Sequence, residues 1–310
     1  MLLLELVAHR RFFRLGWSIR VLDLLPSSPL NVANFLHLTD PDSFPPAFVD
    51  GRIGGDHAPQ HTSDLVRLPL LLMYGGVADA NRRPRPPVDE TVGNPASPYE
   101  VLSYNIGGVE ERSLTNYFLA SRRNNPFFAR CHRLLVALWA ADGGKVSTDG
   151  MHDSPLLRGV PLMGGEFEFE ENGRRYGPEE VSEMLTDYII QGQAITMVMG
   201  LIDEEDNWNG PAYVAKHFYA MDYMVGSQLI NEFTAWNGQR AFDLMSLSLP
   251  HPGEPAGPDQ KLAGEIVEAC LRTSFGFKLA HGLIIRVLGE TLGSLWRKHE
   301  GSFDVQWTYV

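Results

Sequence analysis

The chain has 310 residues, of which 44% are hydrophobic and 21% are charged, a globular composition that excludes a largely disordered protein. Its formal net charge of −12 argues against nucleic acid or an anionic membrane as the main partner, because the overall field repels phosphates. With Cys131 and Cys270 as its two cysteines, the sequence supports neither a disulfide framework nor a cysteine-based zinc site.

The first hundred residues predict a strand, a helix and a loop. Residues 18–26 combine β-branched and apolar side chains before a proline, which predicts a short buried strand. Residues 62–74 predict a helix with Thr62 or Ser63 as its N-cap, a glycine pair at its end and a bend at Pro69. Residues 78–100 are rich in proline and arginine and predict a surface loop.

The rest of the chain reads as two strands followed by helices. Apolar runs predict strands near residues 100–108 and 116–121, and helical spacing continues from there to about residue 141. Residues 178–201 and 210–236 each predict one long helix, and residues 257–274 another. No stretch approaches the roughly 18 apolar residues of a transmembrane helix. We therefore expect an α/β fold with a helical C-terminal half, soluble and cytoplasmic.

The segment 62–81 contains the side chains best suited to chemistry. Asp64 and Arg67 are three residues apart at a helix start, so they share a face and can pair. After the glycine pair, a short strand leads to Asp79 and Asn81. Two oxygen-bearing side chains separated by one residue suit Mg²⁺ or Mn²⁺. An acidic protein that binds a nucleotide diphosphate would need such an ion to neutralise the pyrophosphate.

This pattern resembles glycosyltransferases of the GT-A fold. The similarity is greatest to the capsular polysaccharide synthesis family, in its fungal branch, and to the wider glycosyltransferase family 32. It rests on the helix start Ser63-Asp64-Leu65-Val66-Arg67, the glycine pair and the Asp-x-Asn triplet. It extends over roughly residues 16–298, with counterparts in the same order at 116–132, 187–193, 208–217 and 278–283.

The resemblance implies a single GT-A-like domain over residues 1–310. Residues 1–165 would form the α/β part that binds the nucleotide sugar, and residues 166–310 a mainly helical acceptor side. The implied activity is transfer of a hexose from a nucleotide-sugar donor to a glycan or small-molecule acceptor in polysaccharide biosynthesis. The implied cofactor is Mn²⁺ or Mg²⁺.

The resemblance also implies roles for particular residues. Asp64, Arg67 and Asp79 would be catalytic, with Asp64 and Arg67 holding hydroxyls of the donor sugar or ribose and Arg67 also near the leaving phosphate. Asp79, Asn81 and His281 would bind the metal ion. The further donor-binding residues are Gly75, Gly76, Asn116 and Lys278.

The sequence departs from the family pattern at three points. The aromatic residue that normally follows Val77 is missing, and Asn81 stands where many relatives have Asp or Gly. The family also has a first strand whose aromatic residue stacks on the nucleotide base, and we expect the segment before residue 16 to be too short to form it. A chain truncated at its N-terminus, which would allow the secretory-pathway lumen as its location, is one interpretation. A decayed relative that serves as a sugar-nucleotide-binding or scaffold protein is the alternative.

Simpler explanations also exist for the singled-out residues. Asp64 and Arg67 fit an ordinary salt bridge at a helix start, Asp79 and Asn81 fit a turn, and His281 fits a buried or capping histidine. A metal-dependent hydrolase is a poorer alternative, because the sequence shows no histidine-rich or multi-carboxylate ligand set.

Overall fold

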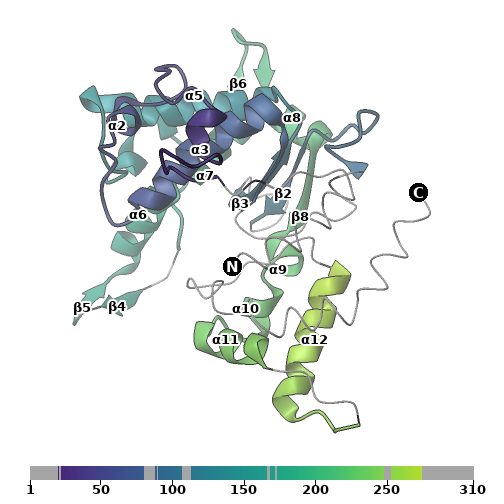
Figure 1. Ribbon diagram of the computed structural model, residues 1–310. Helices are drawn as coiled ribbons and strands as arrows, with labels where there is room; N and C mark the ends of the chain where they lie inside the picture. The colour runs from purple at the N-terminus through teal and green to yellow at the C-terminus, as the bar shows by residue number, and fades with distance from the viewer. Residues whose placement is uncertain are drawn as a thin grey trace. The chain divides into compact units, whose positions relative to one another are not determined.

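The computed structural model of the chain describes residues 20, 22–79, 88, 90–106, 113–165, 168–171, 173–247 and 253–273. By their contacts, these residues divide into two compact units (Figure 1). The first unit contains residues 22–80 and 84–222, and the second contains residue 223 onwards. The division at residue 165 between a donor part and an acceptor part stays a prediction.

The first unit is built on a mixed sheet of four strands among the described residues. The strand order is β1 (Gly76–Asp79), β3 (Leu114–Ser121), β2 (Val101–Asn105) and β8 (Phe218–Asp222). Strand β3 is antiparallel to both of its neighbours, whereas β8 is parallel to β2. A mixed sheet with helices packed against it confirms the predicted α/β class.

Three helices pack together and against this sheet, namely α3 (Ala58–Tyr74), α5 (Pro126–Ala140) and α7 (Ile190–Gly200). The shorter helices and the 3-10 turns of the first unit are α2 (Pro46–Val49), α6 (Pro178–Tyr188), α8 (Gly210–His217), Val32–Asn34, Ala141–Gly143, Met151–Asp153 and Pro155–Leu157. Two small hairpins complete it, β4 (Phe169–Glu171) with β5 (Arg174–Tyr176) and β6 (Ile202–Asp203) with β7 (Trp208–Asn209).

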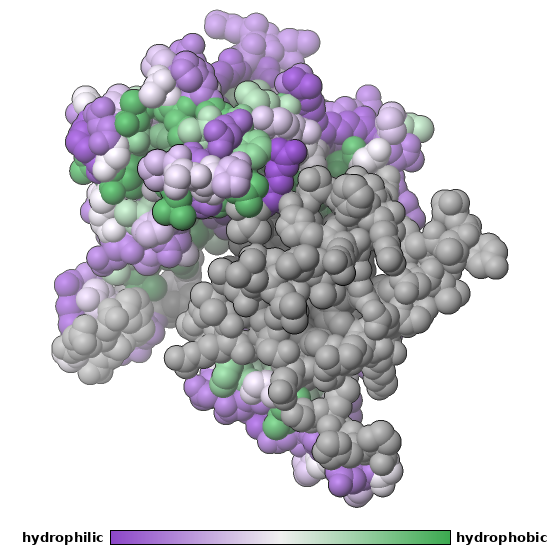
Figure 2. All heavy atoms as spheres, in the orientation of Figure 1, coloured by the Kyte–Doolittle hydropathy of each residue, from purple (hydrophilic) through white to green (hydrophobic). Residues whose placement is uncertain are grey.

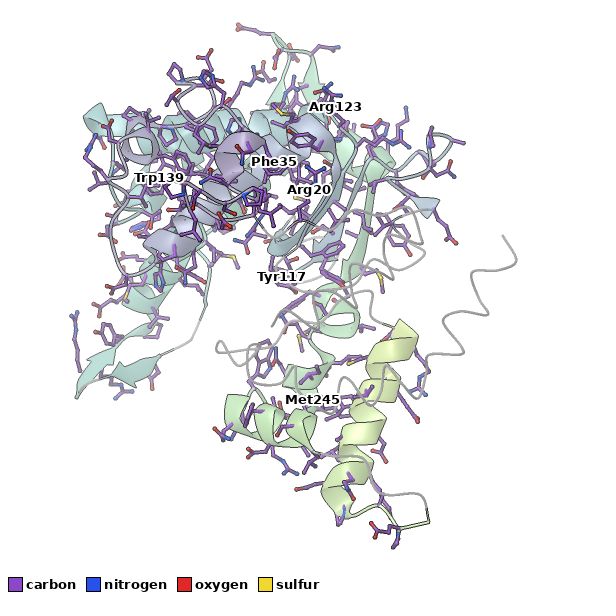
Figure 3. All side chains as sticks on the ribbon, in the orientation of Figure 1. Arg20, Phe35, Tyr117, Arg123, Trp139 and Met245 are labelled. Carbon is purple, nitrogen blue, oxygen red and sulfur yellow. The ribbon has the colours of Figure 1, made fainter. Side chains whose placement is uncertain are left out.

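The core of the first unit follows from the helical spacing of its apolar residues. On α5, Phe128, Leu135 and Trp139 are almost completely buried, and they lie three to four residues from other buried apolar positions. Trp139 lies among the side chains of the helical layer (Figure 3). At the start of this helix the Asn125 side chain accepts hydrogen bonds from two backbone N–H groups, which explains where the helix begins.

Two predicted elements near the N-terminus need correction. The expected buried strand at 18–26 is absent over its described residues, because Leu24 and Leu25 are 55% and 65% exposed and the segment forms turns. The helix begins at Ala58 and not at Thr62, since Pro59 occupies the first turn, where its missing N–H costs nothing. It then continues through Pro69 to Tyr74.

The predicted helix at 210–236 is wrong in its middle. Helix α8 ends at His217, and the next five residues form β8, which pairs in parallel with β2. Within β8, the partly buried Tyr219 and Met221 alternate with the exposed Ala220 and Asp222, which is the period of a strand. The predicted helix at 178–201 is likewise divided into α6 and α7.

The second unit is helical over its described residues. It contains α9 (Tyr223–Gly226), α10 (Leu229–Phe233), α11 (Gly238–Ser246) and α12 (Pro258–Thr273), the last of which confirms the helix predicted at 257–274. These helices bury a separate cluster that includes Leu244, Met245 and Ile266, and Met245 is labelled in Figure 3. The predicted site residues Lys278 and His281 lie outside the described residues.

The visible surface of the first unit mixes hydrophilic and apolar residues (Figure 2). The β6–β7 hairpin projects from this unit as a hydrophilic feature, and it carries four consecutive acidic residues, Asp203, Glu204, Glu205 and Asp206. In the predicted loop at 78–100, the described residues Val88 and Val92 are buried, so these two positions are packed more closely than the composition suggested. None of the described helices is long and apolar enough to cross a membrane.

Candidate functional site

Helix α3 presents one polar face within an otherwise apolar environment. His57, His61, Asp64 and Arg67 follow one another at intervals of three or four residues, so they lie along one side of the helix. On the adjacent side Leu65, Leu68 and Leu71 are buried in the core. The polar face is directed toward the junction of α6 and α7, where the ring of Tyr188 lies 4.4 Å from that of His57.

Asp64 is a buried carboxylate with a cationic partner. Its side chain is 9% exposed, and its Oδ1 atom lies 3.3 Å from Arg67 Nη1. This contact confirms the predicted pairing along the helix. Burial raises the pKa of Asp64 to about 6, and the nearby Arg67 opposes part of that rise. At neutral pH the group is therefore mostly ionised, although a fall of about two pH units would largely protonate it.

Arg67 is held by one nitrogen of its guanidinium group. Nη1 contacts Asp64, donates a hydrogen bond to the backbone carbonyl of Asn116, and lies 3.3 Å from Gln191 Oε1. Nη2 and Nε have no hydrogen-bond acceptor among the described residues. One edge of the planar cation is thus fixed, while the other edge is available for an oxygen-rich ligand.

The carbonyl of Asn116 is available because of an irregularity in the sheet. The pairing of β2 with β3 jumps from Ser103↔Leu119 to Asn105↔Leu114, so β3 has extra residues at this point. The buried hydroxyl of Ser103 donates to the carbonyl of Phe118 at 2.8 Å and satisfies part of the disrupted ladder. Arg67 satisfies the carbonyl of Asn116 from the helical side.

The glycine pair directs the chain from α3 into β1. Gly75 has φ of +66°, and a Cβ atom there would lie 2.7 Å from Arg123 N and 3.1 Å from Ser121 O, so a side chain does not fit. Strand β1 then runs beside β3 to Asp79, whose Cα pairs with that of Phe118. The backbone at Asp79 and the guanidinium of Arg67 therefore both approach the irregular segment of β3.

The predicted metal site stays a prediction. Asn81, His281 and the side chain of Asp79 lie outside the described residues. Within the described ranges, no three histidine, cysteine, aspartate or glutamate side chains converge as a metal ion would require. The donor-binding role predicted for Lys278 is untested for the same reason.

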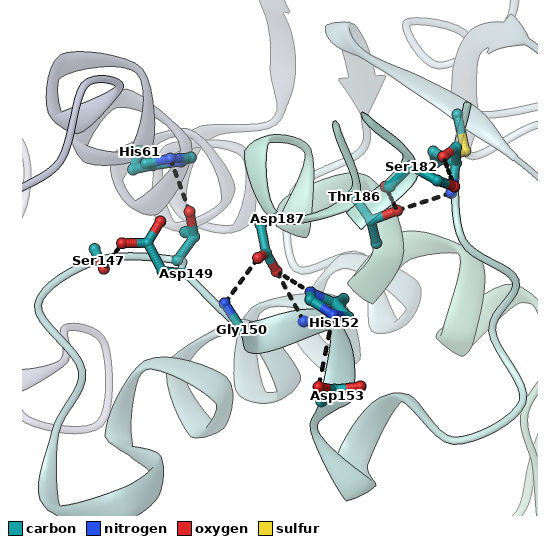
Figure 4. A network of polar contacts seen from close by, with 11 residues as sticks. His61, Ser147, Asp149, Gly150, His152, Asp153, Ser182, Thr186 and Asp187 are labelled. Carbon is teal, nitrogen blue, oxygen red and sulfur yellow. Dashed lines mark hydrogen bonds and ion pairs between the residues drawn. The ribbon is translucent and has the colours of Figure 1, made fainter. Parts of the chain in front are cut away.

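A second polar network ties a loop to α6 (Figure 4). The carboxylate of Asp187 accepts hydrogen bonds from the backbone N–H of Gly150 at 2.7 Å and of His152 at 2.9 Å, and from His152 Nδ1 at 3.0 Å. Thr148 from the same loop is hydrogen-bonded to His61 Nε2 at 3.2 Å. Burial lowers the pKa of His61. This network orders the loop beside the start of α3. The contacts of the Asp187 carboxylate hold the loop in place.

An open hollow of about 590 Å³ lies elsewhere in the first unit, beside α8. Arg130 lies 4.3 Å from the centre of the Trp208 ring and pairs with Asp206 at 2.6 Å. Trp208 is itself buried in the core, together with the partly buried Tyr213. Because Arg130 already covers one face of the Trp208 ring, that face is not available for stacking with a ligand.

Sequence reasoning missed Gln191, which contacts Asp64 and Arg67 from α7, and Tyr188, whose ring lies beside those of His57 and His61. The available signal was a glutamine within an apolar run, Ile189-Ile190-Gln191, in which a polar side chain must be exposed or paired. Gln191 is fully buried.

Comparison with known proteins places the chain among fungal glycosyltransferases. It is 32% identical over 289 residues to glycosyltransferase afumC of Aspergillus fumigatus, covering 90% of this chain and 70% of that protein. It is 31% identical over 309 residues to O-glycosyltransferase braB of Annulohypoxylon truncatum, covering 96% and 71%. O-glycosyltransferase PaGT of Phomopsis amygdali is 28% identical over 308 residues, covering 96% and 72%.

The chain belongs to this glycosyltransferase family. The resemblance found in the sequence is thereby confirmed at the level of glycosyl transfer. No family model matches the chain, and no solved structure does.

Proposed function

We propose that this protein transfers a hexose from a nucleotide-sugar donor to a hydroxyl group of a small-molecule or glycan acceptor. Family membership supports glycosyl transfer in general. The hydroxyl acceptor is suggested by two relatives whose names describe O-glycosyltransferases. A GT-A fold, membership of glycosyltransferase family 32 and a role in polysaccharide biosynthesis belong to the same proposal and rest on the sequence resemblance.

The observation that carries the proposal is the half-fixed guanidinium of Arg67. Three contacts hold Nη1, and the remaining N–H groups have no acceptor among the described residues. A planar cation fixed in this way matches the oxygens of a diphosphate, and it does not need to reorganise as negative charge develops on the leaving group. Arg67 would thus stabilise the departing nucleoside diphosphate.

Asp64 would provide the complementary acceptor. An ionised carboxylate accepts hydrogen bonds from sugar or ribose hydroxyls. Its side chain is buried, which raises its pKa to about 6 and also strengthens such hydrogen bonds. The pair therefore offers both signs of charge to a ligand that carries hydroxyl and phosphate groups.

A divalent cation is the further component implied by the resemblance. Asp79, Asn81 and His281 would hold it, and it would neutralise the charge of the diphosphate. If this assignment is right, Asp79→Ala should abolish donor hydrolysis, and Asn81→Asp should keep or raise both activity and metal affinity.

Donor hydrolysis tests the proposal directly. The purified chain would be incubated with UDP-glucose, UDP-galactose, UDP-N-acetylglucosamine and GDP-mannose in the presence of Mn²⁺. We expect hydrolysis of at least one donor, lowered about 100-fold by Arg67→Ala and less by Arg67→Lys. Arg133→Ala serves as the control, because Arg133 is 65% exposed and pairs only with Asp206 among the described residues. Absence of both hydrolysis and calorimetric binding of UDP with Mn²⁺ would favour the scaffold alternative.

A further inference from the structure

The side-chain amide of Gln191 joins the two residues of the buried ion pair. Gln191 lies on α7, 127 residues along the chain from Asp64, and has no exposed surface. Its Nε2 donates to the backbone carbonyl of Asp64 at 2.8 Å, and its Oε1 lies 3.3 Å from Arg67 Nη1. The two partners fix the orientation of the amide, because one accepts and the other donates.

This contact is not needed to form either helix. In an α-helix the carbonyl of Asp64 is already directed at the N–H of the residue four positions later. The helix α7 contributes Ile190, Ala194, Ile195 and Val198 to the apolar core. A glutamine buried among such residues costs stability unless both ends of its amide are paired. Here both ends are paired, and both partners belong to the polar face of α3.

We propose that Gln191 is a positioning residue, which holds the guanidinium of Arg67 against β3 and keeps its free edge directed at the donor. The inference rests on the proposed function, since it assumes that Arg67 binds the donor diphosphate. Gln191 itself would not touch the donor. It would act entirely through Arg67, together with the carbonyl of Asn116 on the other side.

The physical reason lies in the alternative that Gln191 prevents. An arginine beside a carboxylate prefers a bidentate pair, in which two N–H groups bond the two oxygens. In that arrangement Nη2 or Nε would be occupied by Asp64 and withdrawn from the ligand. Gln191 and Asn116 both hold Nη1, which is the nitrogen nearest to Asp64, and no hydrogen bond joins Nη2 or Nε to Asp64. A neutral amide achieves this without offering Arg67 a second competing charge.

Gln193 provides a matched control on the same helix. It is also a buried glutamine, with 3% of its surface exposed, but it makes no hydrogen bond to Asp64 or Arg67. We expect Gln191→Leu to lower kcat/KM for the hydrolysed donor about ten-fold or more. Gln193→Leu should leave it within about two-fold of the unchanged protein. Gln191→Glu should not restore activity, because its carboxylate attracts Arg67 and cannot donate to the Asp64 carbonyl.

A double-mutant cycle separates positioning from general support of the fold. If Gln191 acts through Arg67, then Gln191→Leu should have less than about two-fold further effect once Arg67 is replaced by alanine. Losses that multiply would overturn the proposal, as would full activity in Gln191→Leu alone. Either of these outcomes leaves the proposed function intact, provided that the unchanged protein hydrolyses a donor.

A measurement on Arg67 itself covers the case in which no donor is hydrolysed. NMR of ¹⁵N-arginine-labelled protein reports rotation about the Cζ–Nε bond, and Arg67→Lys assigns the signal. We expect hindered rotation in the unchanged protein and in Gln193→Leu, and faster rotation in Gln191→Leu. Equal rotation rates in all three proteins would show that Gln191 does not hold the guanidinium, whatever reaction the protein catalyses.

Discussion

Helix α7 meets its two neighbours in different ways. Its contact with α5 belongs to an apolar cluster that includes Phe128, Leu135 and Ile195. Its contact with α3 at Gln191 consists of hydrogen bonds to Asp64 and Arg67. The first interface stabilises the fold through buried apolar surface, whereas the second buries charge and fixes its direction. The difference indicates that the α5 side stabilises the structure, whereas the α3 side carries the residues to which the proposed function assigns donor binding.

The largest effect is expected from a cavity on the apolar side. Leu135→Ala should lower the free energy of unfolding by about 2–5 kcal/mol, since Leu135 is fully buried and its neighbours relax only in part. Leu156, which is 41% exposed, gives a matched control in which the same change should cost less than about 0.5 kcal/mol. Urea unfolding measures both values. Equal losses of unfolding free energy in the two variants would contradict the conclusion that the apolar α5–α7 interface stabilises the fold.

The polar side should respond to pH in the opposite direction from an ordinary salt bridge. The pKa of Asp64 is about 6 in the folded protein and 3.8 in the unfolded chain, so between these values the folded state holds the extra proton. The free energy of unfolding should therefore fall as the pH rises through this window, by up to roughly 3 kcal/mol. Asp64→Asn should remove this dependence and also abolish donor hydrolysis.

Urea titrations from pH 4 to pH 8 compare the unchanged protein with Asp64→Asn. The exposed Asp142 offers a control, because Asp142→Asn should change the free energy of unfolding by no more than about 0.5 kcal/mol at any pH. A difference between wild type and Asp64→Asn that stays constant with pH would show that the carboxylate is better solvated than its burial indicates.

The smallest effect is expected from an ion pair near the surface. Asp206 is 50% exposed and pairs with Arg130 and Arg133. Asp206→Asn should lower the free energy of unfolding by less than about 1 kcal/mol, and 1 M salt should remove most of that loss. A larger loss that does not depend on salt would show that the Asp206 ion pair behaves like the buried ion pair of Asp64 and Arg67.

Local sequence determined much of the helical layer and part of the site. The i,i+3 spacing of Asp64 and Arg67 predicts their contact, because helix geometry places such residues side by side. The glycine pair predicts the end of α3, since a backbone with positive φ there excludes a side chain. The order of short motifs along the chain is also sufficient to indicate a glycosyltransferase, because those motifs are local in sequence.

Pairing between distant segments was decided by the tertiary structure. The helical flanks of residues 218–222 predict a helix there, yet these residues form a strand because β2 offers them a parallel partner. The available carbonyl of Asn116 depends on an irregular register between β2 and β3, which leaves no trace in either segment alone. Gln191 meets Asp64 across 127 residues of chain. Sequence spacing predicts which side chains share a helix face, but only the packing of separate elements decides what that face will meet.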